Sequence, residues 1–397
     1  MNSNIPGEPR ILVVRLGAMG DVIHGLPAVT ALRAAFPQSH IGWIIEERWI
    51  ELLTSEPAIT DAGRPAPRSK ARPLVDAVHP VNTFRWRKAP FSPQTWRELS
   101  GLLRQLRQAD YQAAIDIQGA WKSALLARLS GAALTIGFER PRESGAAVFY
   151  NRRVSARGAH VVEQNISLLR PLLPPDQGKS GQNGESRATG TAASAEAWKR
   201  PSRMQLPYCE ANEAWAAAEL GRRGLAGAAF AVINPGAGWG AKCWPAERYA
   251  ELARGLGQCG VPSLINIGSE EESLARMVEE GSGGAAQALS CGIGQLIALL
   301  RRARLFVGGD TGPMHLAAAL GVPVVAIFGP TDPARNGPYA TESIVLRRPE
   351  SITSHERRVA PEPAMLTISA AEVLEAARQL LEHASGRAVS QEEVDLG

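Results

Sequence analysis

The fold of this chain is decided by residues 11–37, ILVVRLGAMGDVIHGLPAVTALRAAFP. The stretch opens with an apolar run that is typical of a strand buried on both faces of a parallel sheet. A turn containing Gly17, Gly20 and Asp21 follows, and we expect a helix from about Pro27 to Ala35 after it. A turn that only joined two elements would need neither the glycines nor the carboxylate. The stretch therefore predicts both an α/β domain and a candidate site.

Strand-like apolar runs alternate with helix-like stretches along the rest of the chain. The predicted strands lie in RILVVRL, HIGWII, YQAAIDI, AAFAVINPG, PSLINIG, RLFVGG and PVVAIFG. Helix-like stretches such as GAWKSALLARLSG and PAERYAELARGLGQCG separate several of them. This alternation is the pattern of parallel sheets covered by helices on both faces. We therefore predict an α/β fold with doubly wound, Rossmann-like sheets.

A break in composition divides the chain into two halves. At 397 residues the chain is long for one hydrophobic core. Residues 176–197 contain no large apolar side chain and are rich in Gly, Ser, Asn and Gln, which indicates a linker or surface insertion. The predicted parts are a first domain at 9–175, a linker at 176–203, a second domain at 204–367 and a C-terminal helix at 368–385.

The C-terminal helix has a clear start signal. Ser369 is suited to the N-cap, and Glu372 stands at the capping-box position three residues later. We expect this helix to cross back onto the first domain.

Composition excludes several classes of protein. Apolar residues make up 45% of the chain, charged residues 21%, and the net charge is +4. Residues 1–10 show no signal-peptide pattern, and no run of about 18 apolar residues could span a membrane. The four cysteines have neither metal-ligand nor redox spacing, so we expect free, mostly buried thiols in a cytoplasmic protein.

Charge is unevenly distributed. Residues 64–107 contain ten Lys or Arg against two acids, Asp76 and Glu98. This region predicts contact with an acidic partner.

A second strand–turn–helix pattern lies about 290 residues after the first. Residues 305–320 give a strand, then Gly308-Gly309-Asp310-Thr311-Gly312, and a helix that opens at Pro313. The free N–H groups and dipole of such a helix start favour an anion, and His315 can add a donor. The plainer alternative is a well-capped helix with His315 in the core.

Two further turns follow predicted strands at the same sheet edge. Residues 234–242 carry three glycines and Lys242, which can supply a point charge to phosphate. Residues 266–277 carry Glu270, Glu271 and Glu272, which can hold sugar hydroxyls or simply favour a helix dipole. Together the three turns predict a nucleotide-sugar diphosphate site in the second half.

A diphosphate site in the second half suggests a catalytic role for Asp21 in the first half. If the two halves face each other, its carboxylate lies opposite the diphosphate and can deprotonate an acceptor hydroxyl. Gly17 and Gly20 would leave room for that acceptor. The alternative is that Asp21 only caps its helix.

Several blocks of the sequence resemble those of a known family. MGDVIHGLPAVTALR (19–33), NPGAGWGAKCWP (234–245) and GGDTGPMHLAAALGVPVVAIFGPTDP (308–333) are similar to signature blocks of the ADP-heptose:lipopolysaccharide heptosyltransferases, glycosyltransferase family 9. FRWRKAPF (84–91), AIDIQGAWKSALLARLSG (114–131) and FYNRR (149–153) resemble the heptosyltransferase I branch in particular, which adds the first heptose to the Kdo of lipid A. The similarity runs from about residue 11 to 385, without residues 60–73 and 176–200.

The resemblance implies an inverting enzyme of GT-B architecture, whose two Rossmann-like domains face each other across a cleft. It implies that Asp21 is the general base and that ADP-heptose is the donor. The implied donor-binding residues are Ala237, Gly238, Lys242, Asp310, Thr311, Gly312 and His315, together with Glu271 or Glu272, one of which would hold the adenosine ribose. Ala237 and Gly238 stand where the enterobacterial-type enzymes have threonines, so backbone N–H groups must serve there.

The resemblance also implies an acceptor site for Kdo-lipid A. Its implied residues are Gly20, Arg85, Arg87, Lys88, Gln118, Arg140, Arg142, Arg152 and Arg153. Arginine suits carboxylate and phosphate, and Trp86 and Phe91 could rest on a membrane interface. We expect a peripheral protein at the cytoplasmic face of the inner membrane, and a monomer, although the sequence fixes no oligomeric state.

Other functions fit less well. An epimerase would need paired carboxylates and a histidine around the sugar, and only Asp21 and His24 stand out in the first half. A non-catalytic polyanion-binding protein would not need three diphosphate-type turns. A heptosyltransferase acting on a later core heptose stays open. We expect no nucleic-acid partner, since no recognisable binding motif is present, and no metal or other cofactor, since there is no Asp-x-Asp pair.

Overall fold

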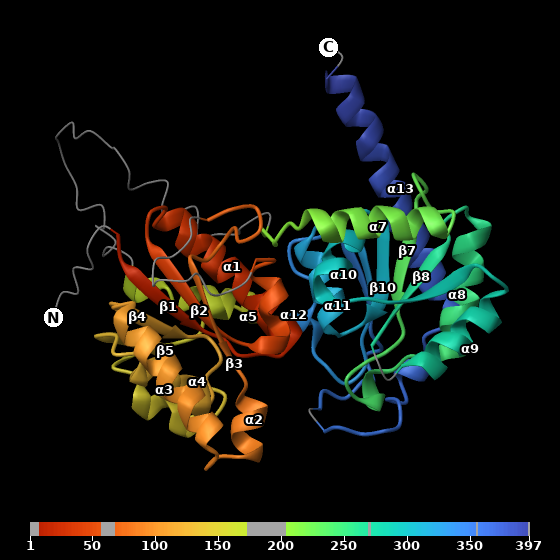
Figure 1. Ribbon diagram of the computed structural model, residues 1–397. Helices are drawn as coiled ribbons and strands as arrows, with labels where there is room; N and C mark the ends of the chain where they lie inside the picture. Colours follow the sequence, from red (N-terminus) through yellow and green to blue (C-terminus); the bar gives the residue numbers. More distant parts are fainter. Residues whose placement is uncertain (1–7, 57–67, 173–203, 269–270, 355, 396–397) are drawn as a thin grey trace, which may run out of the picture. The chain divides into compact units, whose positions relative to one another are not determined.

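The structure is a computed structural model that describes residues 8–56, 68–172, 204–268, 271–354 and 356–395, with side chains described up to residue 383 (Figure 1). The chain divides into two compact units, Met1–Pro207 and Tyr208–Gly397. The predicted linker at 176–203 lies outside the described residues.

The first unit contains a six-stranded, all-parallel sheet with the order β3-β2-β1-β4-β5-β6. Its strands are β1 (Arg10–Val14), β2 (His40–Glu46), β3 (Ala77–Val81), β4 (Ala113–Asp116), β5 (Leu134–Phe138) and β6 (Arg152–Val154). Its helices are α1 (Met19–Ala35), α2 (Thr83–Lys88), α3 (Pro93–Gln108), α4 (Trp121–Leu129) and α5 (Val161–Ser167), with 3-10 turns η1 (Glu47–Leu52), η2 (Ser144–Phe149) and η3 (Arg170–Leu172).

Helices cover both faces of this sheet. Leu12 and Val14 of β1 pack in one core with Leu102 and Leu106 of α3 and with α4. On the other face, α1 approaches so closely that a Cβ on Gly25 would lie 2.7 Å from Ile117. The strands are therefore buried on both sides, as their continuous apolar sequences predict.

The second unit repeats the plan with the order β12-β11-β10-β7-β8-β9, again all parallel. Its strands are β7 (Ala231–Asn234), β8 (Ser263–Ile267), β9 (Ala286–Ser290), β10 (Leu305–Gly309), β11 (Val324–Ile327) and β12 (Ser343–Leu346). Its helices are α7 (Glu210–Arg222), α8 (Ala246–Gln258), α9 (Glu272–Ser282), α10 (Ile293–Leu300), α11 (Gly312–Ala319), α12 (Pro333–Asn336) and α13 (Ala370–Asp395), with 3-10 turns η4 (Gly240–Lys242) and η5 (Met365–Thr367).

Each sheet, counted in its own strands, has the order 3-2-1-4-5-6 of doubly wound dinucleotide-binding folds. The predicted α/β class with two Rossmann-like domains is confirmed. In such sheets ligands bind beyond the carboxyl ends of the strands where the order reverses, between the first and fourth strands. These positions follow β1 and β4 in the first unit and β7 and β10 in the second.

The C-terminal helix packs within the second unit. Val373, Ala377 and Leu380 of α13 belong to the core that β7, β10 and β11 form with α8. The Ser369 N–H donates to Glu372 Oε2 at 2.8 Å, and the Glu372 N–H donates to Ser369 Oγ at 3.2 Å, so the predicted capping box is confirmed. The return of this helix to the first unit stays a prediction.

Two local expectations were wrong. Helix α1 begins at Met19 rather than near Pro27, because the Asp21 carboxylate accepts from the Ala18 N–H at 3.1 Å and so caps an earlier start.

The thiols are free, but Cys209, Cys243 and Cys291 are partly exposed and Cys259 is exposed, since all four stand at element ends or in turns rather than within strands.

Candidate active site

The second unit brings together three predicted donor residues from two turns. Lys242 ends η4 after β7, and Asp310 follows β10, which is the neighbouring strand. Lys242 Nζ lies 2.5 Å from Asp310 Oδ2 and donates to the Asp310 carbonyl at 3.2 Å. His315 Nε2, from the first turn of α11, lies 3.1 Å from Asp310 Oδ1. The carboxylate thus holds a lysine and a histidine at the switch point of the sheet.

The charge state of Asp310 follows from these contacts. Its side chain is 8% exposed, and burial alone would raise its pKa. The hydrogen bond from His315 and the charges of His315 and Lys242 outweigh burial and hold the pKa of Asp310 well below its usual range. Asp310 is therefore ionised, and it fixes the two side chains that can face an anion.

The turn after β7 is shaped by close contacts. Lys242 Nζ lies 5.0 Å from the centroid of the Trp239 ring, a cation–π contact. A Cβ on Gly240 would lie 1.6 Å from the Val359 carbonyl oxygen, and the Ala241 N–H donates to the Arg358 carbonyl at 3.0 Å. The segment before Met365 therefore packs directly on the Lys242 turn.

Glu271 lies beside the same turn. Its Oε2 accepts from the Gly268 N–H at 2.8 Å, and its Oε1 would lie 1.9 Å from a Cβ on Gly236. Glu272 is exposed and begins α9. Of the two predicted acids, Glu271 is therefore the one next to the Gly-rich turn, whereas Glu270 lies outside the described residues.

The remaining predicted donor residues lie in the turn after β7 and at the start of α11. Ala237 and Gly238 lie in the turn, and a Cβ on Gly238 would meet open space. Thr311 is the N-cap of α11, without a side-chain capping bond, and Gly312 is its first residue. The N–H groups at the start of α11 are thus available to an anion.

In the first unit, Asp21 lies in the first turn of α1 and is held by two contacts. Its Oδ1 lies 2.7 Å from Arg15 Nη2, and its Oδ2 accepts from the Ala18 N–H. The Arg15 side chain is 7% exposed and that of Asp21 is 36% exposed. Arg15 Nη1 also donates to the Ile117 carbonyl at 2.6 Å. The carboxylate of Asp21 is therefore accessible to solvent and is paired with the buried guanidinium of Arg15.

Gln118 ties the two strands at this switch point together. Its Oε1 accepts from the Leu16 N–H at 2.8 Å, so the chain after β4 is joined to the chain after β1. Gly20 lies beside Asp21 at the start of α1. Three predicted residues of the first half, Gly20, Asp21 and Gln118, therefore meet at one sheet edge.

The predicted acceptor cations are not all together. Arg85, Arg87 and Lys88 lie on α2, which follows the edge strand β3. Arg152 and Arg153 lie on β6, the opposite edge strand. At the usual strand spacing β6 is roughly 24 Å from β3. Arg140 and Arg142 follow β5, and a Cβ on Gly119 would lie 3.0 Å from the Arg142 nitrogen. Arg142 is thus the cation next to the Gln118 segment.

Some of these cations already have partners. Arg85 pairs with Glu98 and lies 3.7 Å from Glu47 Oε2. Lys88 Nζ lies 4.6 Å from the Phe84 ring centroid. Arg85 is therefore the most constrained cation of α2.

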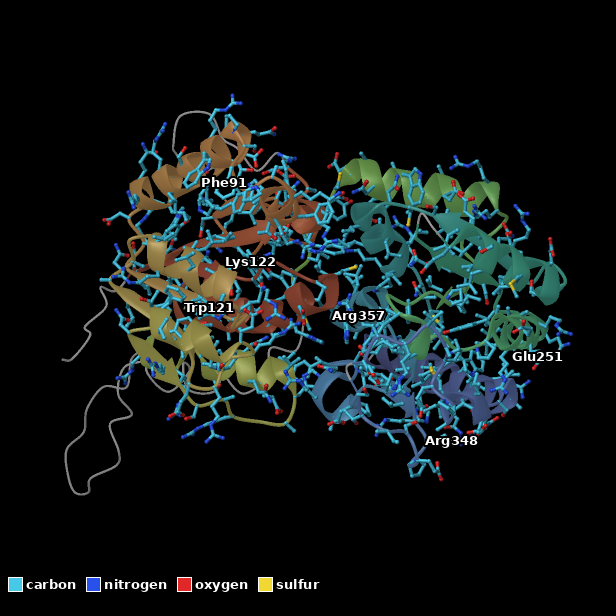
Figure 2. The ribbon with its side chains drawn as sticks, turned by 90° about the horizontal axis from the view of Figure 1, so that it is seen from below. Phe91, Trp121, Lys122, Glu251, Arg348 and Arg357 are labelled. Carbon is cyan, nitrogen blue, oxygen red and sulfur yellow. The ribbon has the colours of Figure 1, made fainter. Side chains whose placement is uncertain are left out.

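Three residues near this edge were not predicted from the sequence. Arg15 pairs with Asp21, and its place directly after a buried strand is the feature of the sequence that could have identified it. Asp116 ends β4 fully buried, accepts from Tyr150 Oη at 2.7 Å and from Ser123 Oγ at 2.9 Å, and has a pKa raised by burial. Trp121 starts α4 and is half exposed (Figure 2). Its ring lies on Gly145, and its centroid is 5.3 Å from that of the Phe149 ring.

Within the part of the chain that the structure describes, no three His, Cys, Asp or Glu side chains form a metal-binding group. Of the described helices, none has the length and apolarity that crossing a bilayer requires.

Known proteins resemble this chain in sequence and in fold. Residues 100–365 match glycosyltransferase family 9 (heptosyltransferase). Lipopolysaccharide heptosyltransferase 1 of Pseudomonas aeruginosa is 30% identical over 345 residues, 85% of this chain and 83% of the relative. The structure of E. coli heptosyltransferase WaaC with ADP has a TM-score of 0.66 at 28% identity and covers 94% of this chain and 99% of that one. The same enzyme with ADP-2-deoxy-2-fluoro heptose has a TM-score of 0.64 at 28% identity over 93% and 99% of the two chains.

Two Rossmann-like units with polar groups at both switch points, together with these likenesses, define a glycosyltransferase. The chain belongs to glycosyltransferase family 9, the heptosyltransferases.

Proposed function

We propose that this enzyme transfers L-glycero-D-manno-heptose from ADP-heptose to the Kdo of Kdo-lipid A, with inversion at the anomeric carbon. The observation that carries the proposal is the Lys242–Asp310–His315 group beside the start of α11. A related enzyme is solved with ADP and with a fluorinated ADP-heptose, which supports the same donor here.

The donor would lie at the switch point of the second unit. Lys242 and the free N–H groups of α11 would contact the diphosphate, because positive charge and helix dipole both favour an anion there. Glu271, beside Gly236, would accept hydrogen bonds from the ribose hydroxyls. Backbone N–H groups at Ala237 and Gly238 would take the place of threonine hydroxyls.

The acceptor would lie at the switch point of the first unit. Asp21 would take the proton of the acceptor hydroxyl, while that oxygen forms a bond to the anomeric carbon. The bond from this carbon to the phosphate oxygen breaks, and ADP leaves with the electron pair on the face opposite the attack. Lys242 and the α11 start stabilise the charge on ADP, and Asp21 later gives its proton to water.

The cations of α2 and Arg142 would contact the acceptor, since Kdo carries a carboxylate and lipid A carries phosphates. The acceptor is a lipid, so we propose that the enzyme works as a peripheral protein at the cytoplasmic face of the inner membrane. ADP-heptose and Kdo-lipid A are its proposed partners, and no metal ion is part of the proposed reaction.

One experiment tests both substrates. The protein is incubated with ADP-heptose and Kdo-lipid A, and ADP release and the product mass are measured, with and without a chelator. The expected result is ADP release with the mass gain of one heptose, unchanged by chelation. Transfer only to an acceptor that already carries heptose would support the later-core alternative. Acceptor binding without ADP release would support a polyanion-binding protein.

A further inference from the structure

Helix α3 of the first unit has an outer face of unusual composition. Its inner residues Leu102 and Leu106 are buried in the core that covers the sheet. Its outer face carries Arg97, Arg104 and Arg107, which are all exposed. Seven- and three-residue spacings place these arginines on one side of the helix. The outer face is therefore a basic stripe.

Two large aromatic side chains adjoin the stripe. Phe91, just before the helix, is 88% exposed (Figure 2). Trp96, in the first two turns of the helix, is 58% exposed. Burying either ring in the protein core would be favourable, so leaving both in water has a cost that a partner could remove. The aromatic residues and the arginines together form what we call the α3 surface: Phe91, Trp96, Arg97, Arg104 and Arg107.

The charges of the α3 surface are not neutralised within the described residues. The one acid of α3, Glu98, is engaged by Arg85 and by Trp86 Nε1, which donates to it at 2.8 Å. Among the described side chains, neither Arg104 nor Arg107 has a carboxylate within ion-pair distance, and Arg97 Nε donates to the Pro93 carbonyl of its own helix. The surface thus offers three cations to an external anion.

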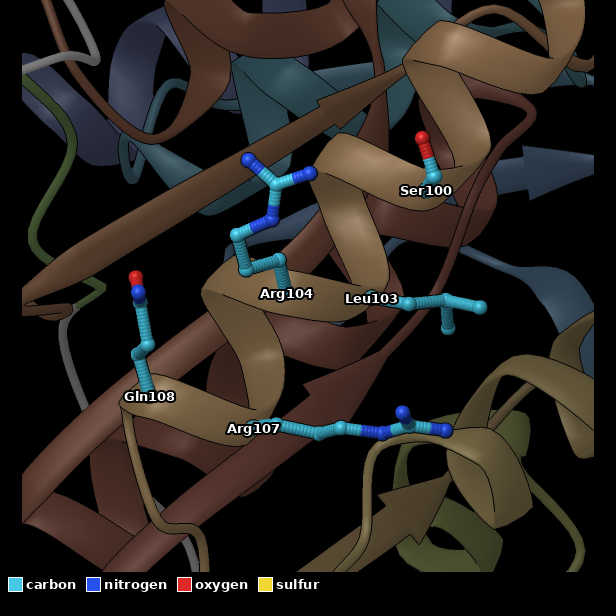
Figure 3. A pocket seen from close by; sticks show the side chains of 5 residues that line it. All are labelled: Ser100, Leu103, Arg104, Arg107 and Gln108. Atoms are coloured by element: carbon cyan, nitrogen blue, oxygen red, sulfur yellow. The ribbon is translucent and has the colours of Figure 1, made fainter.

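A hollow of about 460 Å³ lies along the same stripe (Figure 3). It is lined by Ser100, Leu103, Arg104, Arg107 and Gln108. The side chains of Leu103 and Arg107 extend to the same side of the helix (Figure 3). The hollow therefore combines guanidinium, hydroxyl and amide donors with an apolar wall, which matches a phosphate group attached to an aliphatic chain.

We infer that the α3 surface docks on an anionic phospholipid bilayer. The arginines contact lipid phosphates and the two aromatic rings enter the interfacial layer, where such rings are favourable. An RNA-binding surface would instead interleave its aromatic residues with its cations as a stacking platform, whereas here both rings lie at one end. The inference rests on the proposed function only in that a lipid acceptor brings the enzyme to a membrane.

The test measures sedimentation of the full chain with vesicles, without donor or acceptor. Vesicles of phosphatidylcholine alone are compared with vesicles containing about one third phosphatidylglycerol. Binding is expected to the anionic vesicles and not to the neutral ones. Arg104→Gln with Arg107→Gln should weaken it on the order of twentyfold, since each cation near such a surface contributes about fivefold. Phe91→Ser with Trp96→Ser should weaken it at least as much.

A matched control removes the same charge from the second unit. Arg254 of α8 and Arg276 of α9 are exposed, and Arg254→Gln with Arg276→Gln should bind vesicles as the parent does. If the α3 variants and this control bind equally, the inference is wrong. It is also wrong if the α3 variants lose affinity for single-stranded RNA while their vesicle binding is unchanged.

Activity separates this inference from the proposed function. With Kdo-lipid A dispersed in detergent, the α3 variants should keep the parent rate, and with the acceptor embedded in vesicles they should lose on the order of tenfold. Absence of transfer in every protein would overturn the proposed function and leave the vesicle result standing. Equal loss in detergent and in vesicles would overturn the docking surface alone.

Discussion

The two switch-point turns share one plan and differ in how they hold a carboxylate. Each follows a strand of a parallel sheet, opens a helix and pairs an aspartate with a cation. The cation comes from the same turn for Asp21 (Arg15) and from the turn after the neighbouring strand for Asp310 (Lys242). Asp310 has an 8% exposed side chain, with one oxygen on Lys242 and the other on His315. Asp21 has a 36% exposed side chain, with one oxygen on Arg15 and the other on the Ala18 N–H.

This difference separates two roles that the sequence pattern alone does not distinguish. The side chain of Asp310 is nearly buried and contacts both Lys242 and His315, which favours a positioning role over contact with a substrate. A carboxylate at the surface can accept a proton, and the buried guanidinium of Arg15 keeps it in one orientation. Burial and partners, rather than place in the turn, therefore distinguish the two carboxylates.

The largest expected effect is on Asp21. Asp21→Asn keeps the size and can still accept from the Ala18 N–H, but it removes the proposed base. We expect kcat to fall roughly 10²–10⁴-fold, the usual contribution of a general base, with ADP-heptose still bound. Steady-state kinetics and calorimetric binding of the donor measure the two quantities.

The control for that variant is Asp110→Asn. Asp110 is an exposed aspartate with φ of 48°, a conformation that asparagine also adopts. Its rate should match the parent rate. If Asp21→Asn did the same, Asp21 would be only the cap of α1.

Lys242→Ala should give the next largest effect. It removes a cation from the proposed diphosphate contact, so the donor Kd should rise about 10- to 100-fold, the range for a hydrogen bond to a charged group. Lys242→Arg keeps the charge and should recover part of the affinity. Loss of acceptor affinity with unchanged donor affinity would contradict the donor assignment of the second unit.

Asp310→Asn tests whether Asp310 is a positioning group. Asparagine removes the charge between Lys242 and His315, and the free energy of unfolding should fall by about 1.5 kcal/mol near neutral pH. Because the pKa of folded Asp310 lies below the unfolded value of about 4, its contribution is complete above that pH and is lost as the pH falls.

Denaturant unfolding of parent and Asp310→Asn at several pH values checks this sign. The difference between the two proteins should be constant from about pH 5 to 7 and shrink below about pH 4. A difference that grows on acidification would contradict the ionised, paired state of Asp310.

The smallest effect is expected at α2. Arg85→Gln with Arg87→Gln should raise the acceptor KM about threefold to tenfold, as expected for one or two exposed charged contacts, and should weaken its salt dependence. Arg85→Gln alone should do less, because Arg85 is already paired with Glu98. An unchanged salt response would make these arginines ordinary surface charges.

The sheets could be predicted because continuous apolar strands separated by helices leave few other folds. Lys242 and Asp310 could each be predicted from a glycine-rich turn, but their contact could not, since 68 residues separate them and only adjacent strands bring them together. Arg15 was missed because a charged residue directly after a strand is usually solvated. The acceptor cations were taken as one group because sequence spacing does not reveal that β3 and β6 are opposite edges.

Each half of the molecule has its own described hydrophobic core, one built on β1 and α3 and one built on β7 and α8. The chain should therefore melt in two calorimetric transitions rather than one, and no single Tm describes it. ADP at a concentration of a hundredfold its Kd adds about 2.7 kcal/mol to the free energy of unfolding of the unit that binds it. Only the transition of the second half should then move to higher temperature. Calorimetry with and without ADP therefore shows which half binds the nucleotide.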